Sequence, residues 1–318
     1  MTDYLVLVAG LAILLVGGDI LIRGAVGVAE RLHVPHLIIG LTIVAMGTSA
    51  PELLVSLKAA SDGVGGISIG NVIGSNIANI LLVLALPSLI RATPCRESGV
   101  GRNIAVMIAI TVVFMGMLAD GKLQRFDGIV LLVLLALFFY DQFRSALKHR
   151  RSAAAKAAAE YKDEVGEAPE SAPLLALMLI AGLLALPFGA ELTVRGASSV
   201  AASWGVSQEV IGLTIVAIGT SLPEVAAGLL AVLRNHSSVA LGNVVGSNIF
   251  NIALIMGATG SLVPLPVAER IVRIDMWVML AVSLFIAALA HYRIAIGKAL
   301  AVAMLAVYVA YVGLMFII

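Results

Sequence analysis

Two glutamates in otherwise apolar segments are the residues of this chain best suited to chemistry. Glu52 and Glu224 each end the same short motif, Gly-Thr-Ser-x-Pro-Glu, and Glu224 comes 172 residues after Glu52 (224 − 52). A charged side chain inside a membrane is costly, so its presence there generally marks a functional site. The duplicated carboxylates therefore predict a buried binding site.

A second motif is repeated at the same offset. The pattern Gly-Asn-x-x-Gly-Ser-Asn-x-x-Asn ends at Asn79 and again at Asn251. Its serine and last asparagine are four residues apart and share one helix face, so both can point toward the carboxylates. The glycines let another helix approach closely, and we expect this contact to be internal to the chain. The side chains that these two motifs contribute are Thr48, Ser49, Glu52, Ser75, Asn79, Thr220, Ser221, Glu224, Ser247 and Asn251.

A proline precedes each glutamate and should interrupt its helix. Pro51 has no N–H group, and its ring clashes with the carbonyl four residues earlier, at Gly47. We therefore expect carbonyl groups near Ala45 to Thr48 to lose their partners inside the helix, and Pro223 to have the same effect in the second copy. In hydrocarbon such groups need another partner, which a bound cation can provide.

The chemistry of these groups limits the kinds of ligand that the site can bind. Carboxylate, hydroxyl, amide and carbonyl oxygens suit Ca²⁺ and alkali cations, whereas zinc and copper prefer nitrogen and sulfur. Two ionised glutamates give a charge of about −2, which one Ca²⁺ or two Na⁺ would balance. A site that holds one or the other in turn is the minimal chemistry of an antiporter, and no cofactor is expected.

The composition indicates a membrane protein. Hydrophobic residues make up 61% of the 318 positions, charged residues 12%, and the mean hydropathy is +1.08. A soluble domain could not cover so much apolar surface, so the lipid bilayer is the expected partner. The net charge of +1 gives no indication of nucleic-acid binding. No obligate protein partner is evident.

Ten apolar segments are long enough to cross roughly 30 Å of hydrocarbon. We therefore predict an all-α polytopic protein with ten transmembrane helices. The segments lie near residues 4–22, 35–60, 69–90, 103–119, 127–144, 173–194, 207–233, 241–263, 275–291 and 295–317.

The distribution of Lys and Arg predicts the orientation in the membrane. With the N-terminus outside, 14 of the 20 basic residues fall in inside loops, as the positive-inside rule requires. Both termini would then lie outside the cell membrane, and the polar linker 148–172 would be cytoplasmic. Because five spans precede the linker, the second repeat, 173–318, is inverted relative to the first, 1–147. Inverted repeats are typical of transporters whose binding site lies at the bilayer midplane.

The paired motifs resemble the two repeats of the cation/Ca²⁺ antiporter superfamily, in particular prokaryotic sodium/calcium exchangers. This resemblance implies that Glu52 and Glu224 are the central Ca²⁺ ligands, with Asn79 and Asn251 at the centre of the site. It also implies flanking Na⁺ sites formed by Thr48, Ser49, Ser75, Thr220, Ser221, Ser247 and the carbonyl groups of Ala45 and Ala217.

The choice of coupling ion stays open at the level of sequence. Members that co-transport K⁺ place Asp at the position of Asn251, so the resemblance favours K⁺-independent exchange. Any Na⁺ beyond two would make the exchange electrogenic. Proton-coupled Ca²⁺ exchange on the same fold is the main alternative, since buried carboxylates can trade protons for Ca²⁺.

The sequence argues against two other classes of function. An intramembrane serine hydrolase would need a base beside Ser49, and no His or Lys lies near that depth. The chain is therefore not expected to be an enzyme. A Ca²⁺ channel would show flux that neither saturates nor requires a counter-ion.

Two charged pairs near the ends of apolar segments are interpreted as helix-end ion pairs. Asp19 and Arg23 are four residues apart, and Glu191 and Arg195 repeat this arrangement 172 residues later.

Overall fold

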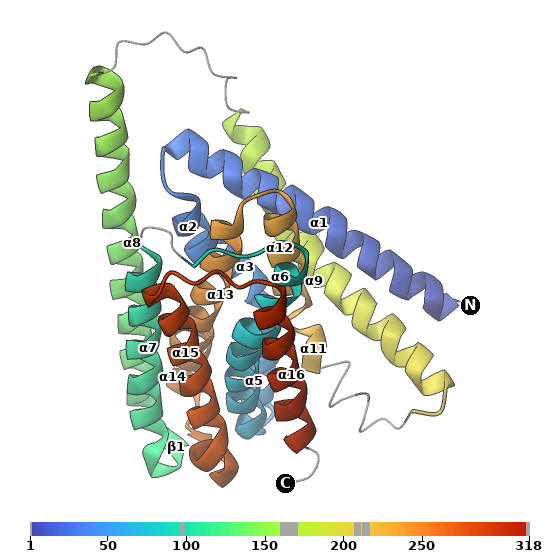
Figure 1. Ribbon diagram of the computed structural model, residues 1–318. Helices are drawn as coiled ribbons and strands as arrows, with labels where there is room; N and C mark the ends of the chain where they lie inside the picture. Colours follow the sequence, from blue (N-terminus) through green and yellow to red (C-terminus); the bar gives the residue numbers. More distant parts are fainter. Residues whose placement is uncertain (1, 96–98, 160–170, 207–210, 212–216, 316–318) are drawn as a thin grey trace.

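The protein is a bundle of helices with one short pair of strands (Figure 1). The computed structural model describes residues 2–95, 99–159, 171–206, 211 and 217–315, and the side chains among them except those of 152–159 and 217. Within these ranges eight helices are long and apolar enough to cross a membrane, or nine if one bent pair counts as a span. The longer elements are α1 (Thr2–Leu32), α4 (Ala50–Ser61), α5 (Gly65–Ala78), α7 (Val100–Met117), α8 (Arg125–Ala159), α9 (Ala172–Ser203), α12 (Leu222–Leu233), α13 (Ser237–Phe250), α15 (Met276–His291) and α16 (Lys298–Met315).

Short helical pieces complete several of these spans. Their dihedral angles stay close to helical, but several are π-helical turns, in which one residue is inserted into the regular ladder. These pieces are α2 (His36–Ile39), η1 (Gly40–Val44), α3 (Ala45–Thr48), η2 (Asn79–Val83), α6 (Ala85–Ile90), η3 (Leu118–Asp120), α11 (Ala217–Gly219), η5 (Asn251–Met256), α14 (Gly257–Leu262) and η6 (Ile271–Asp275).

Two spans form the centre of the bundle. The 18-residue apolar windows of Gly65–Ile90 and Ser237–Leu262 are 72% and 94% buried, against 17% for Lys298–Met315. These central spans carry the second repeated motif, so its polar residues lie inside protein instead of facing lipid. This placement agrees with the rule that polar groups at membrane depth face the bundle interior.

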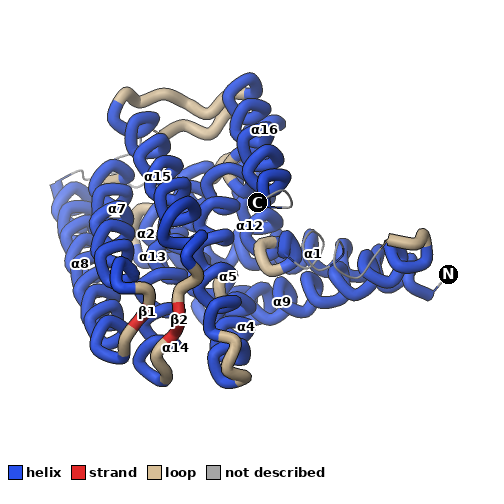
Figure 2. Tube along the Cα trace, turned by 90° about the horizontal axis from the view of Figure 1, so that it is seen from below, coloured by secondary structure: helices blue, strands red, loops and turns tan. Residues whose placement is uncertain are grey.

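Helices α1 and α9 lie side by side and extend away from the central bundle (Figures 1 and 2). Glycines let the two backbones come into contact. A Cβ atom at Gly10 would lie 2.5 Å from the backbone nitrogen of Thr193, and one at Gly182 would lie 2.7 Å from Cα of Leu21. The glycines of this contact recur every seven residues on both helices: Gly10, Gly17, Gly24, Gly182, Gly189 and Gly196.

The expected internal contact of the motif glycines is present in the second copy. A Cβ atom at Gly242 would lie 2.6 Å from the carbonyl oxygen of Leu37, and one at Gly246 would lie 2.6 Å from that of Leu41. At Gly70 and Gly74, no described atom lies within 4 Å of such a Cβ atom. The repeat would place their partners at positions 209 and 213, which lie outside the described residues.

Loop contacts join the two halves of the chain at both ends of the bundle. Strand β1 (Lys122–Leu123) pairs antiparallel with β2 (Leu265–Pro266), and Thr93 forms a bridge with Ile296. At the offset of 172, positions 93 and 296 correspond to 265 and 124, and position 124 directly follows Leu123, so the two contacts match to within one residue. Figure 1 draws β1 at one end of the bundle and the α15–α16 loop, which carries Ile296, at the other. Equivalent loops at opposite ends are what an inverted repeat requires.

One expected boundary differs from the structure, and another falls on residues that the structure does not describe. The first part of the expected linker, 148–159, continues α8 without a break, because its alanine-rich sequence favours helix. The first half of the expected seventh span falls mostly on 207–210 and 212–216, outside the described residues. The ten-span count therefore stays a prediction.

The helix-end ion pair is present in the first copy only. Arg23 lies 3.0 Å from Asp19, which also pairs with Arg234 beyond the end of α12. No ion pair joins Glu191 and Arg195, both of which are described and exposed, so that prediction is wrong. Spacing allows such a pair, but exposed charges gain little from forming it.

Candidate ion-binding site

The predicted break in the first motif is present. Helices His36–Thr48 and Ala50–Ser61 meet at 44°, and Ser49 at the junction has φ −82° and ψ 6°. Ser221, the equivalent residue, has φ −87° and ψ 2° and separates α11 from α12. Each break is followed by proline in the first turn of the next helix, where its missing N–H group is tolerated.

The carbonyl group of Ala45 is not left without a partner, contrary to expectation. It accepts the N–H of Ser49 at 3.1 Å and the hydroxyl of Thr48 at 3.4 Å. The chain closes one last helical turn before it bends, which satisfies this oxygen. In the second copy the N–H of Ser221 donates to the carbonyl of Ile218, at 3.1 Å.

The two glutamates lie in the first turns of α4 and α12, and each is 1% exposed. The hydroxyl of Ser49 donates to Oε1 of Glu224 at 3.3 Å, which links the first motif to the second across 175 residues. The fold therefore brings both carboxylates into one buried cluster, as the repeated motif predicts.

Asn79 and Asn251 begin the π-helical turns η2 and η5. Each side-chain amide donates to an asparagine of the opposite copy: Asn79 to Asn248 Oδ1, and Asn251 to Asn76 Oδ1, both at 3.0 Å. The side-chain NH₂ groups of Asn79 and Asn251 are thereby engaged, and the Oδ1 atoms of the same two residues remain available as acceptors. The extra residue of a π-helical turn is a common way to aim a functional side chain inward.

Among the residues that the structure describes, four buried oxygen atoms in this cluster have no hydrogen-bond partner. They are Oε2 of Glu52, Oε2 of Glu224, Oδ1 of Asn79 and Oδ1 of Asn251. The four come from two equivalent positions in each copy. A buried acceptor without a donor costs about 1–3 kcal/mol, so four in one cluster call for a compensating ligand. An all-oxygen set with two carboxylates fits Ca²⁺ or alkali cations.

The hydroxyl residues of the motifs differ in how the structure places them. Thr48 donates to Oδ1 of Asn243 at 3.2 Å and lies 3.5 Å from the hydroxyl of Ser247. Ser75 and Ser221 are buried, 5% and 2% exposed, and Ser75 lies one helical turn before Asn79. Thr220 is half-buried. Thr48, Ser49 and Ser247 are thus joined by contacts to the opposite copy. Ser75 lies within α5, and Thr220 and Ser221 form the turn between α11 and α12.

Three asparagines that sequence reasoning left without a role belong to the same network. Asn76 and Asn248 hold the amides of Asn251 and Asn79, and Asn243 accepts the hydroxyl of Thr48. All three lie inside the repeated motif, and the first two are 172 residues apart. Their repetition at a buried helix face was the signal that could have identified them.

The fold and this cluster define a polytopic helical membrane protein that gathers buried oxygen ligands for a cation from both halves of its chain. Comparison with known proteins agrees with this class. Residues 2–144 and 174–317 match the family described as sodium/calcium exchanger protein. The chain belongs to this family of membrane antiporters and is not an enzyme.

Individual relatives cover most of the chain. It is 31% identical to the sodium/calcium exchanger MaX1 of Methanosarcina acetivorans over 316 residues, which span 89% of this chain and 90% of the relative. A solved structure of the sodium-calcium exchanger NCX_Mj matches with a TM-score of 0.82, 33% identity and 98% coverage of both chains. The Ca²⁺/H⁺ antiporter ChaA of Bacillus subtilis is 28% identical over 215 residues, 63% of this chain and 60% of that protein.

Proposed function

We propose that this protein exchanges Na⁺ for Ca²⁺ across a cell membrane by alternating access. The observation that carries the proposal is the set of four buried, unpaired oxygens on Glu52, Glu224, Asn79 and Asn251. In this proposal Ca²⁺ binds the two carboxylates and is flanked by the asparagine oxygens. The name of the relative MaX1 supports the same activity.

The flanking hydroxyls supply the Na⁺ sites in this proposal. Na⁺ is a hard cation that is satisfied by neutral oxygens, which are abundant beside the carboxylates. Serving Ca²⁺ and Na⁺ from overlapping ligands makes their binding mutually exclusive, and this competition couples the two fluxes. The proposed Na⁺ ligands are Thr48, Ser49, Ser75, Thr220, Ser221, Ser247 and the carbonyl groups of Ala45 and Ala217. For Ala45, ligation requires that its carbonyl exchange the hydroxyl of Thr48 for the ion.

We further propose that the exchange is electrogenic and independent of K⁺. The centre of the site contains two carboxylates, since positions 79 and 251 are both Asn. One Ca²⁺ balances this charge, and a third Na⁺ on the return step would carry net charge. Transport would then respond to voltage by about 2.3 kcal/mol per charge per 100 mV.

The proposed topology has ten spans in two inverted five-helix repeats, 1–147 and 173–318. The equivalent loop contacts at opposite ends of the bundle support the inversion. The excess of Lys and Arg in alternate loops supports termini outside and a cytoplasmic linker at 148–172.

Proton-coupled Ca²⁺ exchange is the second candidate. The similarity to the Ca²⁺/H⁺ antiporter ChaA favours it, and two buried carboxylates are sufficient to carry protons. The many hydroxyl groups next to the carboxylates favour Na⁺, because a proton would not require them.

Isotopic ⁴⁵Ca²⁺ uptake into proteoliposomes separates the candidates. Gradients of Na⁺, K⁺ and H⁺ are imposed one at a time, with the other two ions equal on both sides. Uptake driven by Na⁺ alone, and increased or decreased by a membrane potential, is the expected result. Uptake that needs a pH gradient and ignores Na⁺ would reject Na⁺ coupling.

A further inference from the structure

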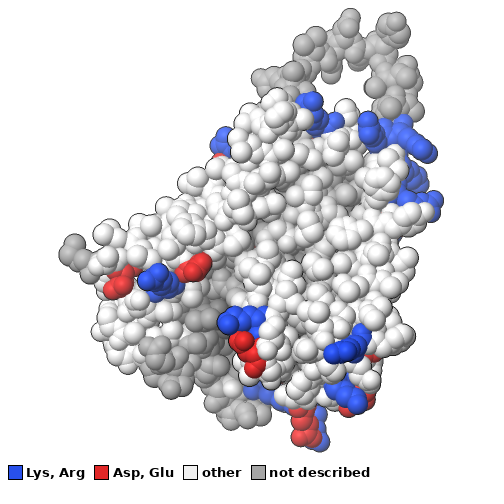
Figure 3. All heavy atoms as spheres, turned by 180° about the vertical axis from the view of Figure 1, so that it is seen from behind, with Lys and Arg blue, Asp and Glu red and all other residues white. Residues whose placement is uncertain are grey.

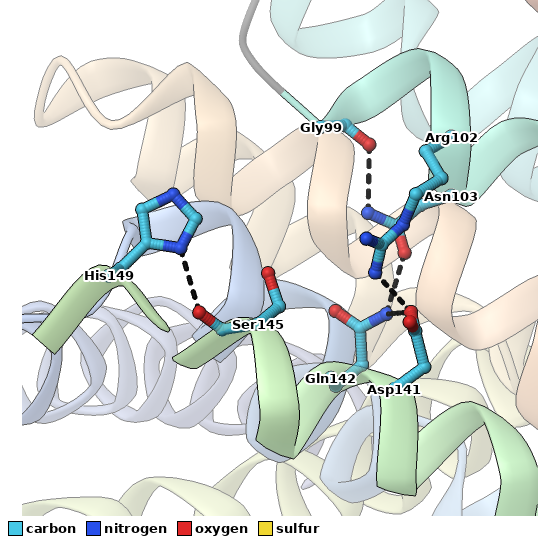
Figure 4. Close-up of polar contacts among 7 residues, drawn as sticks. All are labelled: Gly99, Arg102, Asn103, Asp141, Gln142, Ser145 and His149. Carbon is cyan, nitrogen blue, oxygen red and sulfur yellow. Dashed lines mark hydrogen bonds and ion pairs between the residues drawn. The ribbon is translucent and has the colours of Figure 1, made fainter. Parts of the chain in front are cut away.

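A polar pocket of about 350 Å³ lies where the start of α7 meets the stretch of α8 from Gln142 to His149 (Figure 4). The first residues of the broken span, Pro35 and Ile38, form another wall. This end of α8 leads into the linker, so the proposed topology places the pocket at the cytoplasmic surface of the membrane. None of the proposed ion ligands lines it.

The pocket is lined by basic groups. Arg102, Lys148 and His149 all contribute to its wall. Arg102 forms an ion pair with Asp141 (Figure 4). This pair occupies part of the guanidinium group of Arg102 and fixes the direction of the side chain. Asp141 is the one acidic residue between positions 139 and 151, a stretch that also holds Arg144, Arg150 and Arg151. Figure 3 shows Lys and Arg gathered at this end of the molecule, whereas at the opposite end they are interspersed with Asp and Glu.

Two buried amide side chains hold the pocket in shape. Gln142, 2% exposed, donates to Oδ1 of Asn103 at 2.7 Å, and Asn103, 5% exposed, donates to the carbonyl of Gly99 at 2.9 Å. His149 Nδ1 lies 2.8 Å from the carbonyl oxygen of Ser145 (Figure 4). A carbonyl only accepts, so Nδ1 carries the hydrogen, and Nε2 can donate to an anion when the ring is protonated. The walls are thus ordered by contacts that leave the ammonium group of Lys148 and part of the guanidinium group of Arg102 available to an anion.

An apolar groove of about 250 Å³ adjoins this pocket. It runs between α7 and α8, and its wall includes Asp141, the ion-pair partner of Arg102 in the polar pocket. Its walls include Val106, Ala109 and Val113 from α7. These residues follow Arg102 along the helix, so the groove leads from the membrane surface toward the bilayer centre over about 10 Å.

We propose that the pocket and groove together bind one anionic phospholipid. Its phosphate group lies between Arg102, Lys148 and His149, and one acyl chain lies along the groove. Basic pockets between transmembrane helices on the cytoplasmic side are suited to acidic lipid head groups. A free phosphate would contact the same basic groups but has no acyl chain to fill the groove. The adjoining apolar groove therefore favours a phospholipid. A bound head group touching Pro35 and Ile38 would also brace the broken span against α7 and α8.

Native mass spectrometry of the full-length protein, with phosphatidylglycerol or phosphatidylcholine added in a neutral detergent, tests the assignment. The wild type should retain phosphatidylglycerol in preference to phosphatidylcholine. The double variant Lys148→Gln, His149→Gln should bind phosphatidylglycerol about fivefold to thirtyfold more weakly, as expected for losing one or two charged contacts. The matched control is Arg151→Gln, which removes a charge from the same helix end but outside the pocket and should keep the preference.

A second variant tests the groove. Ala109→Phe places a ring in the groove at an exposed position, so it should weaken binding of long-chain phosphatidylglycerol without unfolding the protein. Thermal unfolding in detergent verifies that each variant is folded. Equal phosphatidylglycerol binding by the wild type and the double variant would overturn the proposal, as would an equal loss in Arg151→Gln. Displacement of the lipid by inorganic phosphate at matched concentration would show a free-anion site instead.

Discussion

Asn76 and Asn248 exchange hydrogen bonds across the centre of the molecule. The side-chain amide of Asn76 donates to the backbone carbonyl of Asn248 at 3.3 Å, and that of Asn248 donates to the carbonyl of Asn76 at 3.2 Å. The two residues occupy the same position in the two copies of the motif. Their reciprocal contact joins α5 to α13 and also orients Asn79 and Asn251, whose amides they accept.

This exchange predicts a stability cost for either asparagine. Asn76→Ala or Asn248→Ala removes one amide and leaves buried donors and acceptors unpaired, so the free energy of unfolding should fall by about 1–3 kcal/mol. The midpoint of thermal unfolding in detergent measures the effect. Asn71→Ala is the matched control, because Asn71 is only half-buried and makes a single 3.4 Å contact with Ser56. An equal loss in the control would mean that the reciprocal pair contributes no more to the free energy of unfolding than an ordinary half-buried contact.

Removing either central charge should stop Ca²⁺ transport. Glu52→Gln and Glu224→Gln keep the size of the side chain but delete a carboxylate from the buried cluster. We expect Ca²⁺ flux to fall by about a hundredfold or more, which corresponds to about 2.7 kcal/mol of lost ion binding. Glu269→Gln, a change at an exposed residue paired with Arg273, should leave the flux unaltered. Normal exchange in either central variant would place the site elsewhere.

Acid should inhibit exchange. A proton and a cation compete for the same carboxylate oxygens, so protonation of Glu52 or Glu224 removes a ligand. Flux measured at equal pH on both sides of the vesicle should therefore fall as the pH is lowered, and added Ca²⁺ should partly restore it. A rate that rises steadily toward acid would favour proton coupling.

The asparagine at position 251 should control the dependence on K⁺. Asn251→Asp adds a third carboxylate to the cluster, so a further monovalent cation is needed to balance its charge. We expect Ca²⁺ flux in this variant to become sensitive to K⁺ or to proton concentration, while the wild type stays indifferent to K⁺. Asn235→Asp, in the loop after α12, adds the same charge outside the cluster and should have no such effect.

The single cysteine should report on unfolding. Cys95 is 1% exposed in the loop between α6 and α7, and burial raises the pKa of its thiol to about 11. The thiolate is the reactive form, so at pH 8 the folded protein should contain about a hundredfold less of it than an ordinary thiol. Labelling with a maleimide should be slow until denaturant is added. Rapid labelling of the native protein would show that this loop opens readily.

The repeated motifs were sufficient to predict the centre of the fold. The break before Glu52, the convergence of the two glutamates and the burial of Asn79 and Asn251 all follow from residue types and their spacing. The hydrogen bonds of Asn76, Asn248 and Asn243 could not be assigned in this way, because their partners come from the other half of the chain. The π-helical turns at Asn79 and Asn251 were also missed, since local sequence does not reveal where a helix takes in an extra residue.

Predictions from local spacing failed where the surrounding structure decides whether an ion pair or a helical hydrogen bond forms. The spacing of Asp19 and Arg23 equals that of Glu191 and Arg195, yet only the first pair forms. The satisfied carbonyl of Ala45 is a similar case, because whether a helix closes its last turn depends on the bend angle and not on the proline alone.

The bridge between Asp19 and Arg234 has no counterpart in the second half of the chain. The equivalent positions are Glu191 and Asp62, which carry like charges and repel instead of attracting. Two duplicated halves with identical contacts would give the two open conformations of a carrier the same energy. In the proposed alternating-access mechanism, an attractive contact made by one half alone would favour one of these conformations, so we expect the two directions of transport to differ in speed under mirrored ion gradients.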